Sequence, residues 1–79
     1  MYTRLRIELD GQEYQTSWDH GFEPHAGDVL TVKGIGVTVQ YRRLDDENLD
    51  HLIVKVSSDY FGASSVLAKR LLEKGWVKI

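Results

Sequence analysis

Alternating apolar and polar residues on both sides of Asp10-Gly11 predict a β-hairpin. Asp-Gly supplies the positive φ angles that both central residues of a type I′ turn require. In this register the apolar side chains Leu5, Ile7, Leu9, Tyr14 and Trp18 share one face, so the hairpin has one buried and one solvated side. The predicted cross-strand pairs are Leu9 with Gln12, Ile7 with Tyr14, Leu5 with Thr16 and Thr3 with Trp18.

A second hairpin is predicted from residues 28–33 and 37–42, two segments rich in β-branched side chains, which Gly34-Ile35-Gly36 joins. We expect a type II′ turn that begins at Gly34, because the β-branched Ile35 resists positive φ. Val32 then faces Val37. A turn at Ile35-Gly36 would instead pair Val32 with Val39, and both alternatives bury the same apolar face.

A third apolar run, residues 51–56, predicts a fifth strand with Leu52, Val54 and Val56 pointing inward. The segment before it, residues 43–50, is too polar for the core. Its acidic residues lack the Gly and the alternating ligands of a calcium loop, so we interpret it as a solvated turn. The five strands are expected to pair antiparallel throughout.

Helical spacing of Tyr60, Ser64, Leu67, Ala68 and Leu71 predicts a C-terminal helix over about residues 59–74. Ser58 is the predicted N-cap, although Gly62 disfavours helix and would delay its regular part. Gly75 suits the left-handed position after the last turn, with Trp76 then packed on Leu71. Residues 76–79 alternate and predict a short edge strand.

These elements predict a single α+β domain over residues 1–79. Its curved five-stranded antiparallel sheet is either open or closed into a small barrel, and the helix covers the open side. Trp76 is expected at the edge of the core. The predicted core consists of Leu5, Ile7, Tyr14, Trp18, Leu30, Val32, Val37, Val39, Leu52, Val54, Val56, Leu67 and Leu71.

Composition limits how this fold is stabilised. The chain has 79 residues, 42% of them hydrophobic and 28% charged, and it contains no Cys. A domain of this size buries only about 60% of the surface that its unfolded chain exposes. Packing alone must therefore stabilise it, unless self-association adds buried area.

Charge and hydropathy exclude several classes. The longest aliphatic run, residues 52–54, is far shorter than the roughly 18 residues of a membrane helix, and the charged N-terminus does not resemble a signal peptide, so we expect a cytoplasmic protein. The net charge of −2 argues against a dedicated nucleic-acid binder. Acidic residues dominate residues 1–59, whereas basic residues dominate the C-terminal helix.

The segment 19–28 is the strongest candidate for chemistry, because it is long for a connection in so small a domain. His20, His25 and Asp28, joined by His51 if the fold brings it near, could bind a small ligand or a metal ion, with a hydrolytic role as one possibility. Their spacing matches no established metal signature. The alternative is a solvated loop in which Phe22 covers the open end of the sheet and Pro24 stiffens the turn.

The absence of a recognisable catalytic constellation or cofactor motif favours a small intracellular, non-enzymatic interaction module. Its partner would be another protein or a second copy, bound through a sheet edge, the helix or the 19–28 loop. The predicted interaction residues are Phe22, Arg42, Arg43, Lys69 and Arg70.

Nucleic-acid binding is a further alternative, because basic residues beside aromatic ones can hold single strands on a sheet. Arg42 and Arg43 follow Tyr41, and Arg4 and Arg6 lie on the outer face of the first hairpin. Tyr14 and Trp18 are expected to point into the core, which leaves little surface for stacking.

Overall fold

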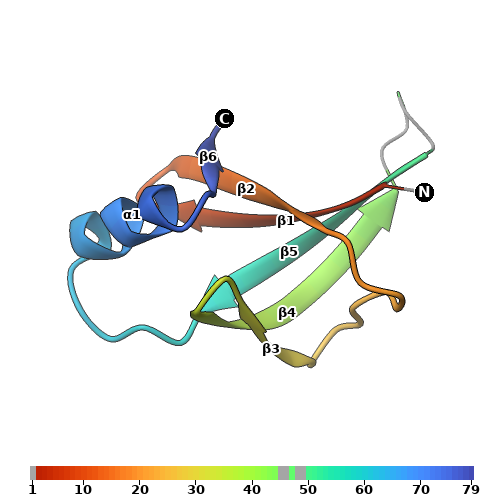
Figure 1. The fold of residues 1–79 in the computed structure, drawn as a ribbon, viewed down its shortest axis with the longest axis horizontal. Coiled ribbons are helices and arrows are strands. Elements are labelled where there is room, and N and C mark those ends of the chain that lie inside the picture. The colour runs from red at the N-terminus through yellow and green to blue at the C-terminus, as the bar shows by residue number, and fades with distance from the viewer. Residues whose placement is uncertain (1, 45–46, 48–49) are drawn as a thin grey trace.

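The computed structural model describes residues 2–44, 47 and 50–79 (Figure 1). Over these residues the chain forms six strands and one helix, so the α+β class and the C-terminal helix are confirmed. The elements are β1 (Tyr2–Leu9), β2 (Gln12–Trp18), β3 (Val29–Val32), β4 (Ile35–Leu44), β5 (His51–Ser58), α1 (Ser64–Glu73) and β6 (Val77–Lys78).

The first hairpin has the predicted register, from Leu9 opposite Gln12 to Thr3 opposite Trp18. Asp10 and Gly11 have φ angles of 50° and 82°, as a type I′ turn requires. Local turn chemistry and the alternation of apolar residues indicate the same pairing here, so the prediction is confirmed residue by residue.

The second hairpin turns at Lys33-Gly34, not at either predicted position. Both residues have positive φ, 51° and 80°, and Val32 pairs with Ile35. This register buries Ile35 in the core. Left-handed backbone at a non-glycine residue costs about 1–2 kcal/mol. Burying an Ile side chain contributes about 1.5–3 kcal/mol, so burial of Ile35 decides the register.

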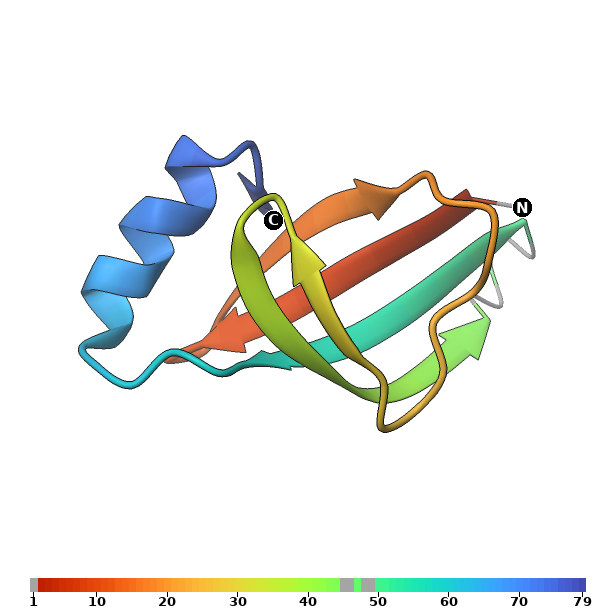
Figure 2. The ribbon, with the colours of Figure 1, turned by 60° about the horizontal axis from the view of Figure 1, so that its bottom comes forward.

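The strand order is β3-β4-β5-β1-β2-β6. The edge strand expected within residues 76–79 is present as β6 and brings the sheet to six strands rather than five. The all-antiparallel pairing is wrong, because β1 pairs with β5 in parallel, from Tyr2 opposite His51 to Ile7 opposite Val56. The connection 19–28 carries the chain from β2 across one end of the sheet to β3 (Figure 2). β5 therefore lies beside β1. The sheet is strongly curved but not closed, with β3 and β6 as its edges.

The buried core agrees closely with the predicted set. Leu30 is only half-buried, Ile35 joins the cluster, and Trp76 is 1% exposed rather than at the edge. Tyr14 and Trp18 point inward as expected. The alternation of apolar residues along each strand was therefore sufficient to identify most of the interior.

The helix ends as predicted but begins later. The N–H of Trp76 donates to the carbonyl of Leu71 (2.9 Å), and Gly75 has a φ of 97°, which is the geometry of a Schellman motif. The predicted N-cap is wrong, because α1 begins at Ser64 after Ala63. Ser58 still belongs to β5, and its Oγ accepts a bond from the N–H of Tyr60 (3.0 Å).

The two ends of the sheet are covered differently. α1 lies beside one end, which we call the helix end, where β1 finishes and β4 begins (Figures 1 and 2). The opposite end, which we call the mouth, is formed by the first residues of β1 and β5, the last residues of β2 and β4, and residues 19–23. The helix does not cover the mouth.

Candidate functional site

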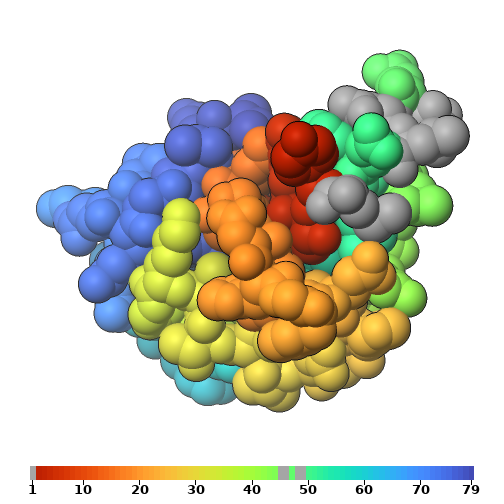
Figure 3. All heavy atoms as spheres, turned by 45° about the vertical axis from the view of Figure 1, so that its right-hand side comes forward, coloured from red at the N-terminus to blue at the C-terminus, as the bar shows by residue number. Residues whose placement is uncertain are grey.

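Two hollows lie at the mouth, and Glu23 lines both of them. The first, the aromatic groove, has a volume of about 520 Å³. The second, the edge hollow, has a volume of about 290 Å³. The aromatic groove is lined by Tyr2, Thr3, Arg4 and residues 17–23, and the edge hollow by Glu23, Arg42, Arg43, Leu44 and Leu52. Figure 3 turns the mouth toward the viewer and shows the start of β1 (red) beside the end of β2 and the following loop (orange).

Trp18 organises one wall of the aromatic groove. Its indole N–H donates a hydrogen bond to the carbonyl of Phe22 (2.8 Å), and the rings of His20 and Phe22 meet it edge-on at 4.4 and 5.5 Å. The loop is thereby held around the indole. Phe22 lies against Trp18, but its side chain remains 57% exposed, so it covers the mouth only in part.

The opposite wall contains Tyr2 and Arg4 from β1. Tyr2 is 67% exposed, and its ring meets that of His51 at 5.4 Å. Arg4 is half-buried, and its cross-strand neighbours Ser17 and Ile53 carry no charge. Within the described residues its guanidinium has no ion pair or hydrogen bond. The groove therefore holds a cation that the described chain does not neutralise.

The neighbouring cations of the sheet are engaged. Arg6 donates from Nε to Oε1 of Gln15 (3.0 Å), and Lys55 donates from Nζ to Oε2 of Glu13 (3.1 Å). Within the described residues Arg4 differs from these two because its cross-strand neighbour Ser17 donates to Asp19 and does not bond to the guanidinium.

The last four residues of β4, Tyr41–Leu44, form a free strand edge. β3 pairs with β4 only as far as Thr38, and Val39 then bonds to the backbone of residues 27 and 28. Beyond that point no described residue bonds to the backbone of β4 on the side away from β5. This stretch therefore offers unpaired N–H and C=O groups beside the edge hollow.

A bulge between Val39 and Tyr41 decides which side chains enter the edge hollow. After it, Arg42 and Leu44 lie opposite the buried Val54 and Leu52, on the core side of the sheet, although both are exposed. Arg43 lies on the outer side. Arg42 binds Oε2 of Glu23 at 2.9 Å, whereas Arg43 has no ion pair or hydrogen bond within the described residues.

The residues predicted to bind a ligand or metal ion are placed apart. His20 packs against Trp18, and His51 packs against Tyr2. The carboxylate of Asp28 accepts the N–H of His25 (2.8 Å) and closes a local turn. In the part of the chain that the structure describes, no three His, Asp or Glu side chains form a group that could hold a metal ion. Of the acidic run, Asp45, Asp46 and Asn48 lie outside the described residues, as does Leu49.

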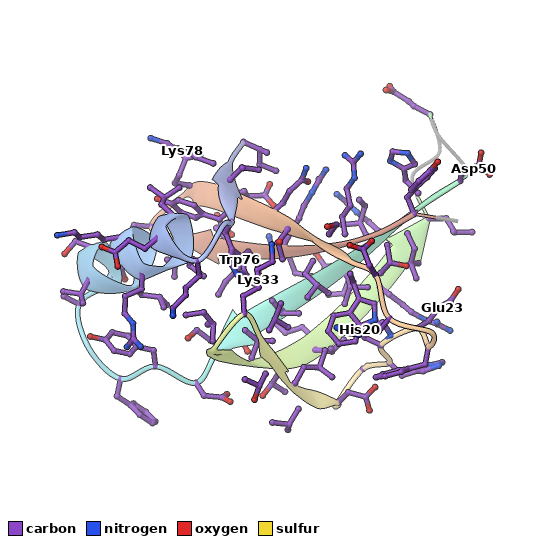
Figure 4. The ribbon with its side chains drawn as sticks, viewed as in Figure 1. His20, Glu23, Lys33, Asp50, Trp76 and Lys78 are labelled. Atoms are coloured by element: carbon purple, nitrogen blue, oxygen red, sulfur yellow. The ribbon has the colours of Figure 1, made fainter. Side chains whose placement is uncertain are left out.

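The predicted interaction residues belong to two regions. Phe22, Arg42 and Arg43 lie at the mouth, whereas Lys69 and Arg70 lie on α1 at the helix end. The guanidinium of Arg70 lies 6.0 Å from the centre of the Tyr60 ring. Figure 4 shows this separation through His20 and Glu23 on one side and Lys78, which follows α1, on the other. The five residues therefore do not form one surface.

Sequence reasoning missed Tyr2 and Arg4 as groove residues and Leu44 as a hollow residue. Their role depends on the parallel pairing of β1 with β5 and on the bulge in β4, neither of which has a local signal. The length of the 19–28 connection was the sequence feature that pointed to this end.

No protein-family model, no curated protein and no solved structure matches this chain in the comparisons. None of the helical segments in the described residues has the length and apolar character that crossing a membrane requires. The geometry of the mouth is therefore the guide to function.

Proposed function

We propose that the protein is a small interaction module that binds an extended segment of another protein along the free edge of β4, Tyr41–Leu44. The observation that carries the proposal is the half-paired state of this strand: β4 is ten residues long, and β3 covers only its first part. An incoming strand would complete the backbone hydrogen bonds that β4 leaves open.

The side chains beside this edge indicate what the partner segment carries. Alternate residues of an added strand would face the interior and the solvent in turn. Those facing inward would lie beside Leu44 in the edge hollow, which suits an apolar side chain. Those facing outward would lie beside Arg43, whose planar guanidinium suits a carboxylate. The expected partner segment therefore alternates apolar and acidic residues.

The same charges favour a different protein over a second copy. Two copies paired through this edge would bring Arg42 and Arg43 of one copy close to those of the other. Like charges on facing strands are destabilising, and a bulge with basic side chains is a common protection against self-pairing. An acidic partner converts this repulsion into attraction.

Nucleic-acid binding receives less support from the sheet. Tyr14 and Trp18 are buried, which removes them as stacking surfaces. Of the arginines on which this alternative rests, Arg6 is engaged by Gln15 and Arg42 by Glu23. Affinity for nucleic acid depends on the number of phosphates that free cations neutralise. The free edge of β4, in contrast, needs a backbone partner.

A defined peptide tests the proposal. The ¹⁵N-labelled protein is titrated with a short capped peptide that alternates Val and Glu, and the amide spectrum is recorded. We expect shifts at Tyr41–Leu44 and in their β5 neighbours, and none at Val77–Lys78 on the other edge. Two further peptides carry N-methyl groups, one on the odd-numbered and the other on the even-numbered residues. Only every second N–H of an added strand points toward β4, so the peptide in which these N–H groups are methylated should not bind, whereas the other should bind.

Matched variants complete this test. Arg43→Glu should lower the affinity for the Val/Glu peptide by about tenfold, equivalent to about 1.4 kcal/mol, and should raise the affinity for a Val/Lys peptide. Lys78→Glu, on the opposite edge strand, should change neither affinity. Shifts centred on β6, equal binding of both N-methylated peptides, or a stronger response to oligothymidine would overturn the proposal.

A further inference from the structure

We propose that the aromatic groove is a second binding site, separate from the edge of β4, for a small planar molecule that carries an anionic group. The groove has a volume of about 520 Å³, which falls within the range of small-molecule sites, roughly 300–1,000 Å³. Its walls combine exposed aromatic rings with an arginine that has no partner in the described chain.

The aromatic walls are held in place before any ligand arrives. Trp18 fixes the loop through its bond to the Phe22 carbonyl, and its ring contacts orient His20 and Phe22. Tyr2 lies on the other wall and is oriented by His51. Tyr2 and Phe22 are both largely exposed, although each is a large apolar side chain. A flat ring between them would bury surface on both sides and gain stacking contacts.

The charged groups of the groove determine where the ligand's anion lies. Glu23 already binds Arg42, and Asp19 accepts a hydrogen bond from the hydroxyl of Ser17 (3.2 Å). Asp19 keeps its negative charge, so an anion can be held only at the guanidinium of Arg4, which is half-buried and forms no ion pair within the described residues. A phosphate or carboxylate beside Arg4 would form charge-assisted hydrogen bonds there.

Two kinds of molecule share this chemistry, nucleotides and aromatic carboxylates, and both are planar and anionic. Their binding does not depend on a strand at the edge of β4, since the two hollows share only Glu23. The inference therefore stands independently of the proposed peptide site.

The two tryptophans provide a built-in readout. The indole N–H of Trp18 lies in the wall of the groove, whereas that of Trp76 is buried elsewhere. In the ¹⁵N spectrum, AMP or indole-3-acetate at millimolar concentration should shift the Trp18 indole signal and leave that of Trp76 unchanged. Adenosine lacks the anionic group, and ribose 5-phosphate lacks the planar ring. Each should bind about tenfold more weakly than AMP.

The pattern of responses identifies the ligand class. A response to AMP alone assigns the groove to nucleotides, and one to indole-3-acetate alone assigns it to aromatic carboxylates; both support the inference. No shift of the Trp18 signal with any of these compounds would overturn it. Adenosine binding as tightly as AMP would overturn it as well, because the role of Arg4 would then be absent.

Variants with matched controls distinguish binding in the groove from non-specific binding. Arg4→Gln and Tyr2→Ala should each weaken binding by about five- to tenfold. Both residues are partly exposed, so the fold should persist. The controls are Arg70→Gln and Phe61→Ala, an arginine and a 99% exposed phenylalanine away from the mouth. Equal losses in the controls would overturn the inference, whereas unchanged control affinities support it.

Discussion

The two tryptophans show how differently the two ends of the sheet are built. Trp76, which follows α1, is 1% exposed, and its indole N–H has no hydrogen-bond partner among the residues that the structure describes. Trp18, at the mouth, is 8% exposed, and its N–H is bound by the carbonyl of Phe22. One ring therefore contributes burial and leaves its polar atom unsatisfied. The other uses its polar atom to position a loop.

The energies of burial and of hydrogen bonding explain why both arrangements are stable. Burying an aromatic side chain removes about 150–250 Å² from water, equivalent to about 4–6 kcal/mol. An unsatisfied buried N–H costs about 1–3 kcal/mol, so the burial of Trp76 remains favourable. At the mouth, Tyr2 and Phe22 keep most of their surface in water and add little stability. The helix end thus stabilises the fold, while the mouth retains exposed rings and free charges that suit binding.

Removing an aromatic ring at each end should give the largest contrast. Trp76→Ala is expected to lower the free energy of unfolding by about 3–5 kcal/mol, because it leaves a cavity between α1 and the sheet. Phe22→Ala should lower it by less than about 1 kcal/mol, since the ring is mainly exposed. Urea unfolding of both variants measures the difference. Comparable losses in the two variants would mean that the mouth is as essential to the fold as the helix end.

Exchanging each indole for a phenyl ring sharpens the comparison. Trp18→Phe loses the bond to the Phe22 carbonyl as well as some volume, and should cost about 2 kcal/mol. Trp76→Phe loses similar volume but also removes the unsatisfied N–H, so its cost should stay below about 1 kcal/mol. Since 1 kcal/mol shifts the Tm of so small a domain by about 4–8 °C, thermal unfolding resolves the two. A larger loss in Trp76→Phe would contradict this account.

Local signals explain how much of the helix end and the core was predictable. Asp10-Gly11 fixed the first register, and Gly75 with Trp76 fixed the end of α1, because each involves residues near one another in the chain. The second turn was mispredicted because the preference of glycine for positive φ was weighed without the burial of Ile35. Local geometry was outweighed there by packing.

The mouth was less predictable, because distant segments assemble it. The 19–28 loop could be identified from its length, yet its histidines were assigned to a common site that the structure does not form. Arg4 enters the groove through the pairing of β1 with β2 and β5. Leu44 faces the edge hollow because one extra residue in β4 shifts the alternation. Neither the pairing of β1 nor the bulge in β4 has a local signal in the sequence.

The smallest expected effect concerns the ion pair that joins the two hollows. Glu23 and Arg42 are 2.9 Å apart, with 48% and 36% of their side chains exposed, and such pairs contribute about 0–1 kcal/mol. Glu23→Gln should therefore leave the free energy of unfolding nearly unchanged. It should also remove a negative charge beside the edge of β4, which lowers the repulsion of the peptide's Glu side chains and tightens binding of the Val/Glu peptide by about two- to fivefold. Peptide titrations of the two proteins measure this gain. A loss of more than about 2 kcal/mol in stability, or weaker peptide binding, would mean that Glu23 holds the mouth in shape rather than repelling an acidic partner.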